Sequence, residues 1–572
     1  MPYAKQNVKV KVSNFSGFDK SFRNSGSLTC GTITPILCDE VIPNSRVSLK
    51  VNIASQLPPL ASDTYMNCKL KVEAFFTPMR LLCRSFENFF CDFPKEVISQ
   101  AYVDKTDPAE SGYYSSLDSV SARVPLYTDS TDPLNAIMDT EPGSLLDYLG
   151  YRTAAPLVAS LATTFTINLL PMVNYHLVWQ EYYRNPRVQK PAFAEPIYGQ
   201  TMQSSLAEGF NPFQAIPYTF FHDDYLAQSG ATIGKNYLLS ANSSDDLKLV
   251  DGVGIDQLRQ RNFGLDYFTS ARVSPQQGAA AAVSFNISDN QGSFTIAQLR
   301  AQNSLQQFRE RNNLASPRLV DQVLARYGAN LSDGVAQRPI CIGSATYDVA
   351  SRSVDQTAVT SSTPSSSNPF NAVAAQYGRA YGVGSDFIIK DFTANEPGYI
   401  LVNVTLVPEV TYSNGNAPMF NHYRSAGSIT DMACSILQNV GDQPIYVEEL
   451  LGIAAASGDS NIFGYTDRYA DFMYIPNQAH GELRESGTLS SFVLQRSFSN
   501  AELSSSFLEI PKTYLDSVFA VSTGVSKLSA WYDAMLDYRV VMPLAEYSLP
   551  SLQDPAYEHG HTVSLRRNGQ IF

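Results

Sequence analysis

Residues 68–76, CKLKVEAFF, alternate apolar and charged side chains along a single short run. The apolar side chains fall on every second position: Cys68, Leu70, Val72, Ala74 and Phe76. Because successive side chains of a strand point to opposite faces, this period of two predicts a half-buried antiparallel strand. A strand of this kind needs partner strands, which must come from elsewhere in the chain.

The pattern recurs close by and again far along the sequence. RVSLKVNI at 46–53 has it, and further strands are predicted at 398–408, 444–451 and 490–498. Strands therefore occur at both ends of the chain, with a long middle region between them. This favours one β framework assembled from the two ends, with large loop and helix insertions, over separate domains in series.

The middle region has helical signals instead. Residues 165–185 predict a helix with Asn168 as its N-cap. Residues 316–328 predict another, with Ser316 at the N-cap, Pro317 in the first turn and Gly328 just past the end. A Ser/Thr-rich low-complexity run at 357–369 predicts a surface loop.

The composition points toward contacts with other proteins. Of 572 residues, only 17% are charged, against roughly 25% in an average soluble domain. The chain has 32 Tyr and 31 Phe, and interface cores are depleted in charge and rich in aromatic side chains. The net charge of −13 argues against nucleic-acid binding by the whole surface.

Charge is nevertheless unevenly distributed. Residues 1–23 hold five Lys or Arg and one Asp, whereas residues 101–150 are strongly acidic. The basic end predicts either an arm that touches a polyanion or a solvated terminus.

The seven cysteines have no C-x-x-C spacing, so neither a disulfide framework nor a zinc site is expected. Reduced thiols in turn suggest folding in a reducing cytoplasm. The N-terminus lacks an apolar segment typical of a signal peptide, and no apolar run approaches 18 residues, so no membrane insertion is expected.

Catalytic motifs are absent from the sequence. His480-Gly-Glu482 matches half of a zinc-deaminase signature, but no P-C-x-x-C supplies the other ligands. We predict no enzyme activity and no cofactor or metal. The aromatic and charged run 461–483 is instead typical of a contact surface, either between subunits or between loops of one chain. Its candidate residues are Tyr465, Arg468, Tyr469 and Asp471.

Five segments, in order, resemble one family. They are FDKSFRNSGSLTCGTITPILCDEVIPNSRVSL (18–49), DTYMNCKLKVEAFFTPMRLLCRSFENF (63–89), INLLPMVNYHLVWQEYYRNP (167–186), RYGANLSDGVAQRPICIGS (326–344) and FGYTDRYADFMYIPNQAHGEL (463–483). Together they resemble the major capsid proteins of microviruses, small single-stranded-DNA bacteriophages, and most of all the gokushovirus-like branch. Thr466 and Met473 depart from the family's pattern, as do residues 200–295 and the tail.

The resemblance implies a mainly β fold, an eight-stranded viral jelly roll of two sheets, as a single domain over 1–572. It implies a T=1 icosahedral shell around circular single-stranded DNA, found in the virion and assembled in the host cytoplasm. Implied partners are further copies of the chain, the viral DNA, a small basic DNA-packaging protein, a minor pilot protein and an unknown host receptor.

The resemblance also gives meaning to the irregular segments. They are a basic arm at 1–23, an acidic loop insertion at 101–160, a variable insertion at 200–295, a surface loop at 355–370 and a C-terminal tail at 550–572. The variable insertion is the candidate for a protrusion near the three-fold axes. Candidate genome contacts are Lys5, Lys9, Lys11 and Arg23. The alternative function is a carbohydrate-binding β-sandwich lectin or a glycosidase on such a sandwich.

Overall fold

The computed structural model describes the chain in segments. These are residues 15–62, 67–82, 142–151, 170–192, 251–275, 338–355, 376–422, 442–452, 462–498, 501–520 and 529–544, with single gaps at 252 and 255, short strands at 123–126 and 165–168, and isolated positions elsewhere. The candidate residues Lys5, Lys9 and Lys11 lie outside the described residues, as do most of the acidic insertion and the tail.

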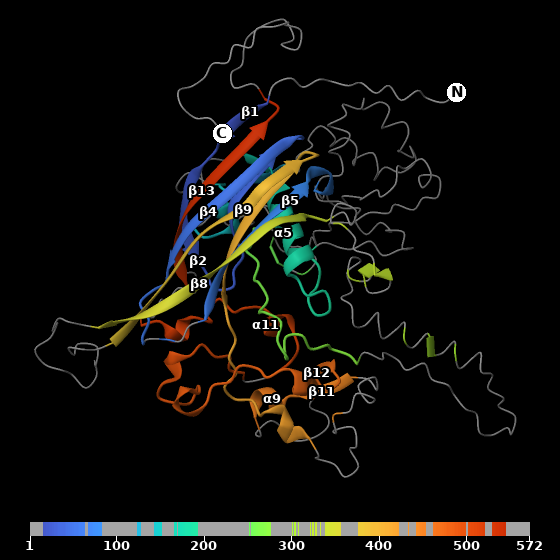
Figure 1. Ribbon diagram of the computed structural model, residues 1–572, viewed down its shortest axis with the longest axis vertical. Coiled ribbons are helices and arrows are strands. Elements are labelled where there is room, and N and C mark those ends of the chain that lie inside the picture. The colour runs from blue at the N-terminus through green and yellow to red at the C-terminus, as the bar shows by residue number, and fades with distance from the viewer. Residues whose placement is uncertain are drawn as a thin grey trace, which may run out of the picture.

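A curled antiparallel sheet dominates the described chain (Figure 1). Its strands run in the order β1-β13-β4-β9-β8-β5-β10-β3, and β2 also pairs with β13. Their bounds are β1 (Ser16–Asp19), β2 (Phe22–Leu28), β3 (Thr34–Val41), β4 (Ser45–Gln56), β5 (Cys68–Pro78), β8 (Ile340–Asp355), β9 (Gln376–Ala394), β10 (Gly398–Pro408) and β13 (Ala530–Met542). Two small sheets pair β6 (Arg123–Leu126) with β7 (Phe165–Asn168), and β11 (Asp442–Tyr446) with β12 (Ile462–Asp467).

The sheet is assembled from distant parts of the sequence, as predicted. β13 lies between β4 and the pair β1 and β2, so the C-terminal strand is hydrogen-bonded to N-terminal ones. The alternating runs at 46–53 and 68–76 are confirmed as parts of β4 and β5. The run at 398–408 is confirmed as β10, which is buried at every position because both of its faces are covered.

One long strand joins two halves that we expected to be separate four-stranded sheets. Residues 376–382 of β9 pair with β8, while residues 381–394 pair with β4. β8 likewise leaves β9 near Val349 and continues along β5. Beyond this junction both strands carry register shifts, and Gly343 of β8 approaches the backbone of Ile388 in β9. Such bulges increase bending, which allows one sheet to curl around a core.

The inward faces of both halves meet in one hydrophobic core. Alternate residues of β4, β5, β10 and β13 supply it, among them Leu49, Val51, Leu70, Val72, Ile400, Val402, Leu536 and Tyr538. A second cluster forms on the other face of β5 and β10, where Phe75 and Leu401 pack with the helix α5 (Leu170–Val178). The expected mainly β framework with insertions is therefore confirmed.

The predicted helix at 165–185 is shorter than expected. Residues 165–168 form β7, so Asn168 ends a strand and is not an N-cap. α5 begins at Leu170 and continues as one π-helical segment, Trp179–Tyr183. In the predicted helix at 316–328, Asp321, Val323, Leu324 and Tyr327 are helical. Gly328 has φ +66° and donates its N–H to Leu324 O, as expected at a helix end.

A small lobe lies below the sheet in Figure 1, where one predicted strand is confirmed only in part and another was wrong. It contains β11, β12 and short helical turns: η5 (Pro418–Asn421), α9 (Glu448–Leu451), α10 (Ala470–Met473), η8 (Gly481–Leu483), η9 (Ser490–Phe492), α11 (Ser505–Leu508) and η10 (Asp516–Val518). The strand predicted at 444–451 ends at Tyr446, where the buried Glu448 and Glu449 begin α9. Residues 490–498 begin as the turn η9 and contribute only isolated bridges, and the Phe498 ring stacks on Tyr412 inside the lobe.

Residues 251–275, the described part of the variable insertion at 200–295, contribute buried side chains to the core. Residues 251–275 cross the junction between the sheet and the small lobe, and Phe263, Tyr267 and Phe268 are buried in the main core. Residues 201–250 lie outside the described residues. No described helix is long and apolar enough to span a membrane. The described cysteines, Cys30, Cys38, Cys68 and Cys341, carry free thiols.

Candidate contact surface and buried polar network

The run that sequence analysis singled out folds as a strand, a tight turn and a short helix. β12 ends at Asp467, Tyr469 takes a left-handed conformation with φ +62°, and α10 follows. Tyr469 is held in this turn by a hydrogen bond from its N–H to Gln443 Oε1 (2.9 Å). A left-handed tyrosine is unusual and costs free energy, so the surrounding contacts must fix it.

The four predicted contact residues lie close together, and each contacts other residues of the same subunit. Tyr465 exchanges backbone hydrogen bonds of 2.8 Å with Arg272. The Arg468 guanidinium lies 5.5 Å from the Tyr469 ring centroid, within the range of a cation–π contact. Asp471 is a buried acceptor for Gln443 Nε2 (2.8 Å) and pairs with His422 Nε2 (2.6 Å). These side chains tie β11, β12 and α10 together.

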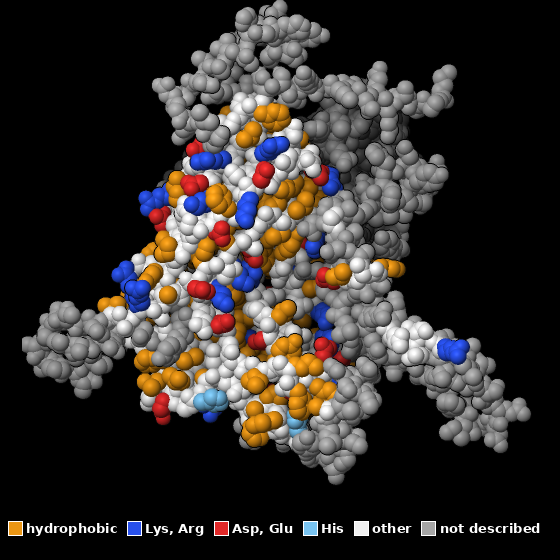
Figure 2. Space-filling view, in the orientation of Figure 1, with side chains coloured by type: hydrophobic (Ala, Val, Ile, Leu, Met, Phe, Trp, Pro, Cys, Tyr) orange, Lys and Arg blue, Asp and Glu red, His pale blue; other side chains and the backbone are white. Residues whose placement is uncertain are grey.

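An exposed apolar surface lies directly beside them. We define the tip surface as Met419, Phe420, Phe472, Met473, Tyr474 and Ile475, each more than half exposed. Figure 2 shows hydrophobic side chains gathered over the small lobe at the lower end of the molecule. The His422 ring stacks on Phe472 at a centroid distance of 5.2 Å, so the two segments of the tip surface touch.

In the half-signature His480-Gly-Glu482, the Glu482 carboxylate is bound by a neighbouring turn. Glu482 accepts hydrogen bonds from the N–H and Oγ1 of Thr488, and these bonds lower the pKa of its carboxyl group. Within the described part of the chain, His, Cys, Asp and Glu side chains nowhere gather in threes to hold a metal ion.

A small pocket of about 140 Å³ opens beside His480 and Arg484. Phe268 and Tyr412 are its aromatic lining residues, and Glu449 is its one carboxylate-bearing residue. Glycoside hydrolysis requires two carboxyl groups across the scissile bond, whereas this pocket presents one. The pocket therefore gives no support to the glycosidase alternative.

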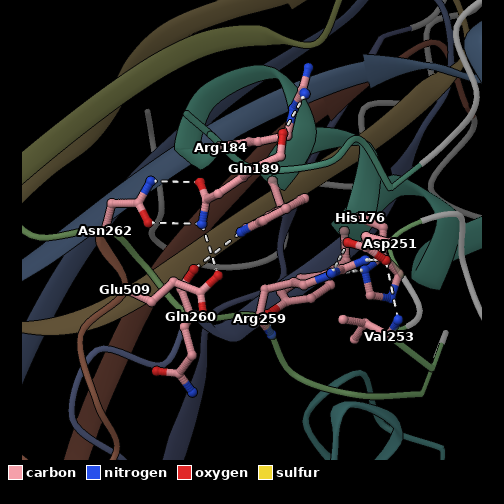
Figure 3. Close-up of polar contacts among 11 residues, drawn as sticks. His176, Arg184, Gln189, Asp251, Val253, Arg259, Gln260, Asn262 and Glu509 are labelled. Atoms are coloured by element: carbon pink, nitrogen blue, oxygen red, sulfur yellow. Dashed lines mark hydrogen bonds and ion pairs between the residues drawn. The ribbon is translucent and has the colours of Figure 1, made fainter. Parts of the chain in front are cut away.

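A buried ionic network fixes the insertion's end to α5 (Figure 3). Arg259 donates both Nη atoms to Asp251 and its Nε to His176 Nδ1 (2.9 Å). Its guanidinium also lies 4.3 Å from the Trp179 ring centroid. Because Nδ1 of His176 accepts this bond, the imidazole is neutral and carries its proton on Nε2. The side chains of Arg259 and Asp251 are 4% and 10% exposed, so their charges compensate each other inside the protein.

A pair of side-chain amides, Gln189 and Asn262, continues the polar contacts of residues 251–262 toward the small lobe. Gln189 Nε2 donates to Asn262 Oδ1 (3.1 Å) and to Glu509 Oε1 (2.8 Å), and Asn262 Nδ2 donates back to Gln189 Oε1 (2.9 Å). Burial raises the pKa of Glu509, although the bond from Gln189 opposes this. Sequence analysis missed these residues, since they match no motif and Asp251, Arg259 and Asn262 fall in the poorly matching stretch 200–295.

A second ion pair links the insertion's end to the sheet. Glu73 of β5 accepts from Arg261 Nη1 (2.5 Å) and from the Tyr183 hydroxyl (2.6 Å). Burial alone would raise the pKa of Glu73, but the hydrogen bonds and charge of Arg261, together with Tyr183, bring it below its usual value.

Glu73→Gln should therefore destabilise the subunit in a pH-dependent way. At pH 7 we expect a loss of about 1–3 kcal/mol in the free energy of unfolding, typical of a hydrogen bond to a charged group. A folded-state pKa below the unfolded value of about 4.5 means that this contribution is complete above pH 4.5 and is lost as the pH falls through the folded pKa. Urea unfolding of both proteins between pH 3 and pH 7 measures the difference. A difference that grows toward pH 3 would contradict the assignment.

The one described candidate genome contact is already paired. Arg23 makes a bidentate contact with Asp533, at 2.7 and 2.6 Å. The hydrogen bonds from Arg23 and Ser25 bring the pKa of Asp533 to about 2, so it is a carboxylate at neutral pH. The positive charge of Arg23 is therefore largely compensated by Asp533 and is little available for binding DNA phosphates.

Comparison with known proteins agrees with the fold. A family described as "Capsid protein (F protein)" matches residues 6–552. The capsid protein VP1 of Chlamydia phage 1 is 24% identical over 94% of this chain and 96% of its own length. That of Bdellovibrio phage phiMH2K is 23% identical over 94% and 95%. That of Spiroplasma virus 4 is 26% identical over 46% of each chain.

A curled antiparallel sheet around a hydrophobic core, with loops tied inward and an exposed apolar tip surface, places the chain among mainly β proteins with large insertions. The match over nearly the whole chain then makes the assignment specific. The chain belongs to the phage capsid protein family described as "Capsid protein (F protein)", and its resemblance to microvirus capsid proteins is confirmed. It is a structural major capsid protein of the virion that assembles with itself into a shell.

Proposed function

We propose that the shell is a T=1 icosahedron enclosing circular single-stranded DNA. The observation that carries this is the collinear match over residues 6–552, which includes both ends of the β framework. The exposed apolar tip surface of the small lobe supports a subunit with obligate neighbours, since such interfaces are more apolar than ordinary protein surfaces.

Electron microscopy of the purified protein tests the proposal. We expect uniform closed particles a few tens of nanometres wide, whose reconstruction places every subunit in an equivalent environment. A stable monomer under all assembly conditions would overturn it, and so would shells with inequivalent subunits.

The basic arm at 1–23 is proposed to contact the genome through Lys5, Lys9 and Lys11. Arg23 is left out because Asp533 compensates its charge. A lysine beside a phosphate displaces a condensed counterion, so binding to single-stranded DNA weakens as salt increases.

Replacing Lys5, Lys9 and Lys11 together by glutamine should flatten this salt dependence. With roughly 0.7 counterions released per contact on a single strand, the slope of log K against log salt should fall by roughly 2. Fluorescence anisotropy with a labelled oligonucleotide measures it. Lys20→Gln is the matched control, because Lys20 already pairs with Asp39 at 2.5 Å and should leave the slope unchanged. An unchanged slope in the triple variant would remove the arm from the genome contacts.

The remaining roles are proposed from family resemblance. The variable insertion at 200–295, apart from its described part 251–275, is the candidate protrusion near the three-fold axes and the candidate host contact, because insertions on rigid scaffolds commonly carry recognition. The buried ion pair of Arg259 and Asp251 would anchor this insertion, because it lies in the described residues that follow 201–250. Assembly is proposed to occur in the host cytoplasm, with the small basic DNA-packaging protein and the minor pilot protein as further virion partners.

A further inference from the structure

The tip surface has the composition of an interface core. Its six side chains are exposed by 53–86%, and Ile475 is the most exposed at 86%. Residues 415–421, GNAPMFN, and 472–479, FMYIPNQA, contain no charged residue at all. Single exposed apolar side chains are ordinary, but a contiguous group without charges marks a binding surface.

The area of the tip surface is large enough for a stable contact. With a full side-chain area of roughly 200 Å² each, the exposed fractions correspond to an apolar area on the order of 700 Å². This exceeds the largest patch of a typical monomer, about 300–600 Å². It approaches the roughly 800 Å² that each partner buries in a standard interface.

The tip surface is also held rigidly from behind. Asp471 is 2% exposed and binds both His422 and Gln443, so it connects η5 to α10 and β11. The His422 ring stacks on Phe472, and the Tyr469 ring meets Phe472 edge-on at 6.0 Å. A preordered apolar surface loses little conformational entropy on binding, which favours tight association.

We propose that the tip surface is a contact between subunits, buried against a second copy of this chain. This rests on the proposed function, because in a shell made of one protein the neighbours of each subunit are further copies. An apolar surface of this size left open on every subunit would make free particles associate nonspecifically, whereas burial against a neighbour drives assembly. Tyr465, Arg468, Tyr469 and Asp471 then act as the support of the contact.

Two pairs of variants test the apolar role. Phe472→Asp with Ile475→Asp should abolish particles, since two carboxylates would have to be buried. Phe472→Leu with Ile475→Leu keeps the surface apolar and should assemble like the original protein. Circular dichroism should show a folded subunit in both, because neither side chain is buried in the monomer. Assembly of the aspartate variant would overturn the proposal.

Thiol accessibility gives a readout that does not depend on blocking assembly. Ile475→Cys should react with a maleimide in free subunits and about tenfold or more slowly in particles, because interface cores exclude solvent. Peptide mass spectrometry separates this site from the native exposed Cys341. Equal reactivity in both forms would place the tip surface on an open face of the shell, available to a different partner, and refute the proposal. Failure of the original protein to form particles would refute the proposed function itself, and the inference with it.

Discussion

Gly343→Ala should destabilise the subunit by at least about 3 kcal/mol and sharply reduce the yield of soluble protein. A Cβ at this position would lie 1.8 Å from the backbone oxygen of Ile388, much closer than any real contact. Relief requires the two strands to separate at the junction where the sheet curls, since the obstacle is backbone and not a movable side chain. Chemical unfolding and the soluble fraction after expression measure the effect.

Gly264→Ala is the matched control. It introduces the same methyl group, but nothing lies within 4 Å of its Cβ position. We expect a change within about 0.5 kcal/mol, as for surface substitutions away from special features. If both alanine variants unfold at the same denaturant concentration, the close approach of β8 to β9 does not constrain the fold.

Asp251→Asn should cost about 3–5 kcal/mol of stability, because it leaves the Arg259 guanidinium as an uncompensated buried charge. The asparagine side chain would keep the shape of the site and accept one hydrogen bond, so the loss measures the charge and not a cavity. The neutral His176 and the Trp179 ring cannot replace a carboxylate. Denaturant unfolding of purified subunits is the measurement.

Two comparisons sharpen this result. Glu409→Gln removes one side of an exposed pair with Lys69, at 3.7 Å, and should cost at most about 1 kcal/mol. The double variant Asp251→Leu with Arg259→Met should be more stable than Asp251→Asn, because no charge remains buried. A double variant less stable than the single one would mean that the hydrogen bonds of Arg259, and not its charge balance, hold the insertion's end.

The outcome of Asp251→Asn bears on assembly as well. The network joins residues 251–262 to α5, and through Gln189 and Glu509 to the small lobe. Loss of the contacts between residues 251–262, α5 and the small lobe would displace the lobe that carries the tip surface. Particles that still form should therefore dissociate at lower denaturant concentration than the original ones.

The sequence by itself identified three strands of the main sheet, β4, β5 and β10, and the assembly of the β framework from distant parts of the chain. The alternation in β4 and β5 and the largely apolar run of β10 are local patterns imposed by which faces are buried, so they identify strands without knowledge of their partners. The location of strands at both ends of the chain also implied long-range pairing, which the register of β13 with β2 and β4 confirms. The end of the helix at Gly328 could also be predicted from local sequence, because the residue after a helix commonly takes the left-handed conformation that glycine adopts easily.

Tertiary structure alone decided where side chains meet. Arg259 and Asp251 match no motif, and their importance arises because the fold removes both from water. The run 490–498 alternates like a strand, yet it begins as the turn η9, and its Phe498 ring stacks on Phe507 inside the small lobe. The run 461–483 showed its aromatic character in the sequence, but which of its residues face inward depends on the left-handed turn at Tyr469. A local sequence pattern records which face of an element is buried, whereas contacts between elements depend on the three-dimensional path of the chain. For this reason, only the folded protein shows that Tyr465, Arg468, Tyr469 and Asp471 support the tip surface from behind while Phe472 and Ile475 are exposed on it.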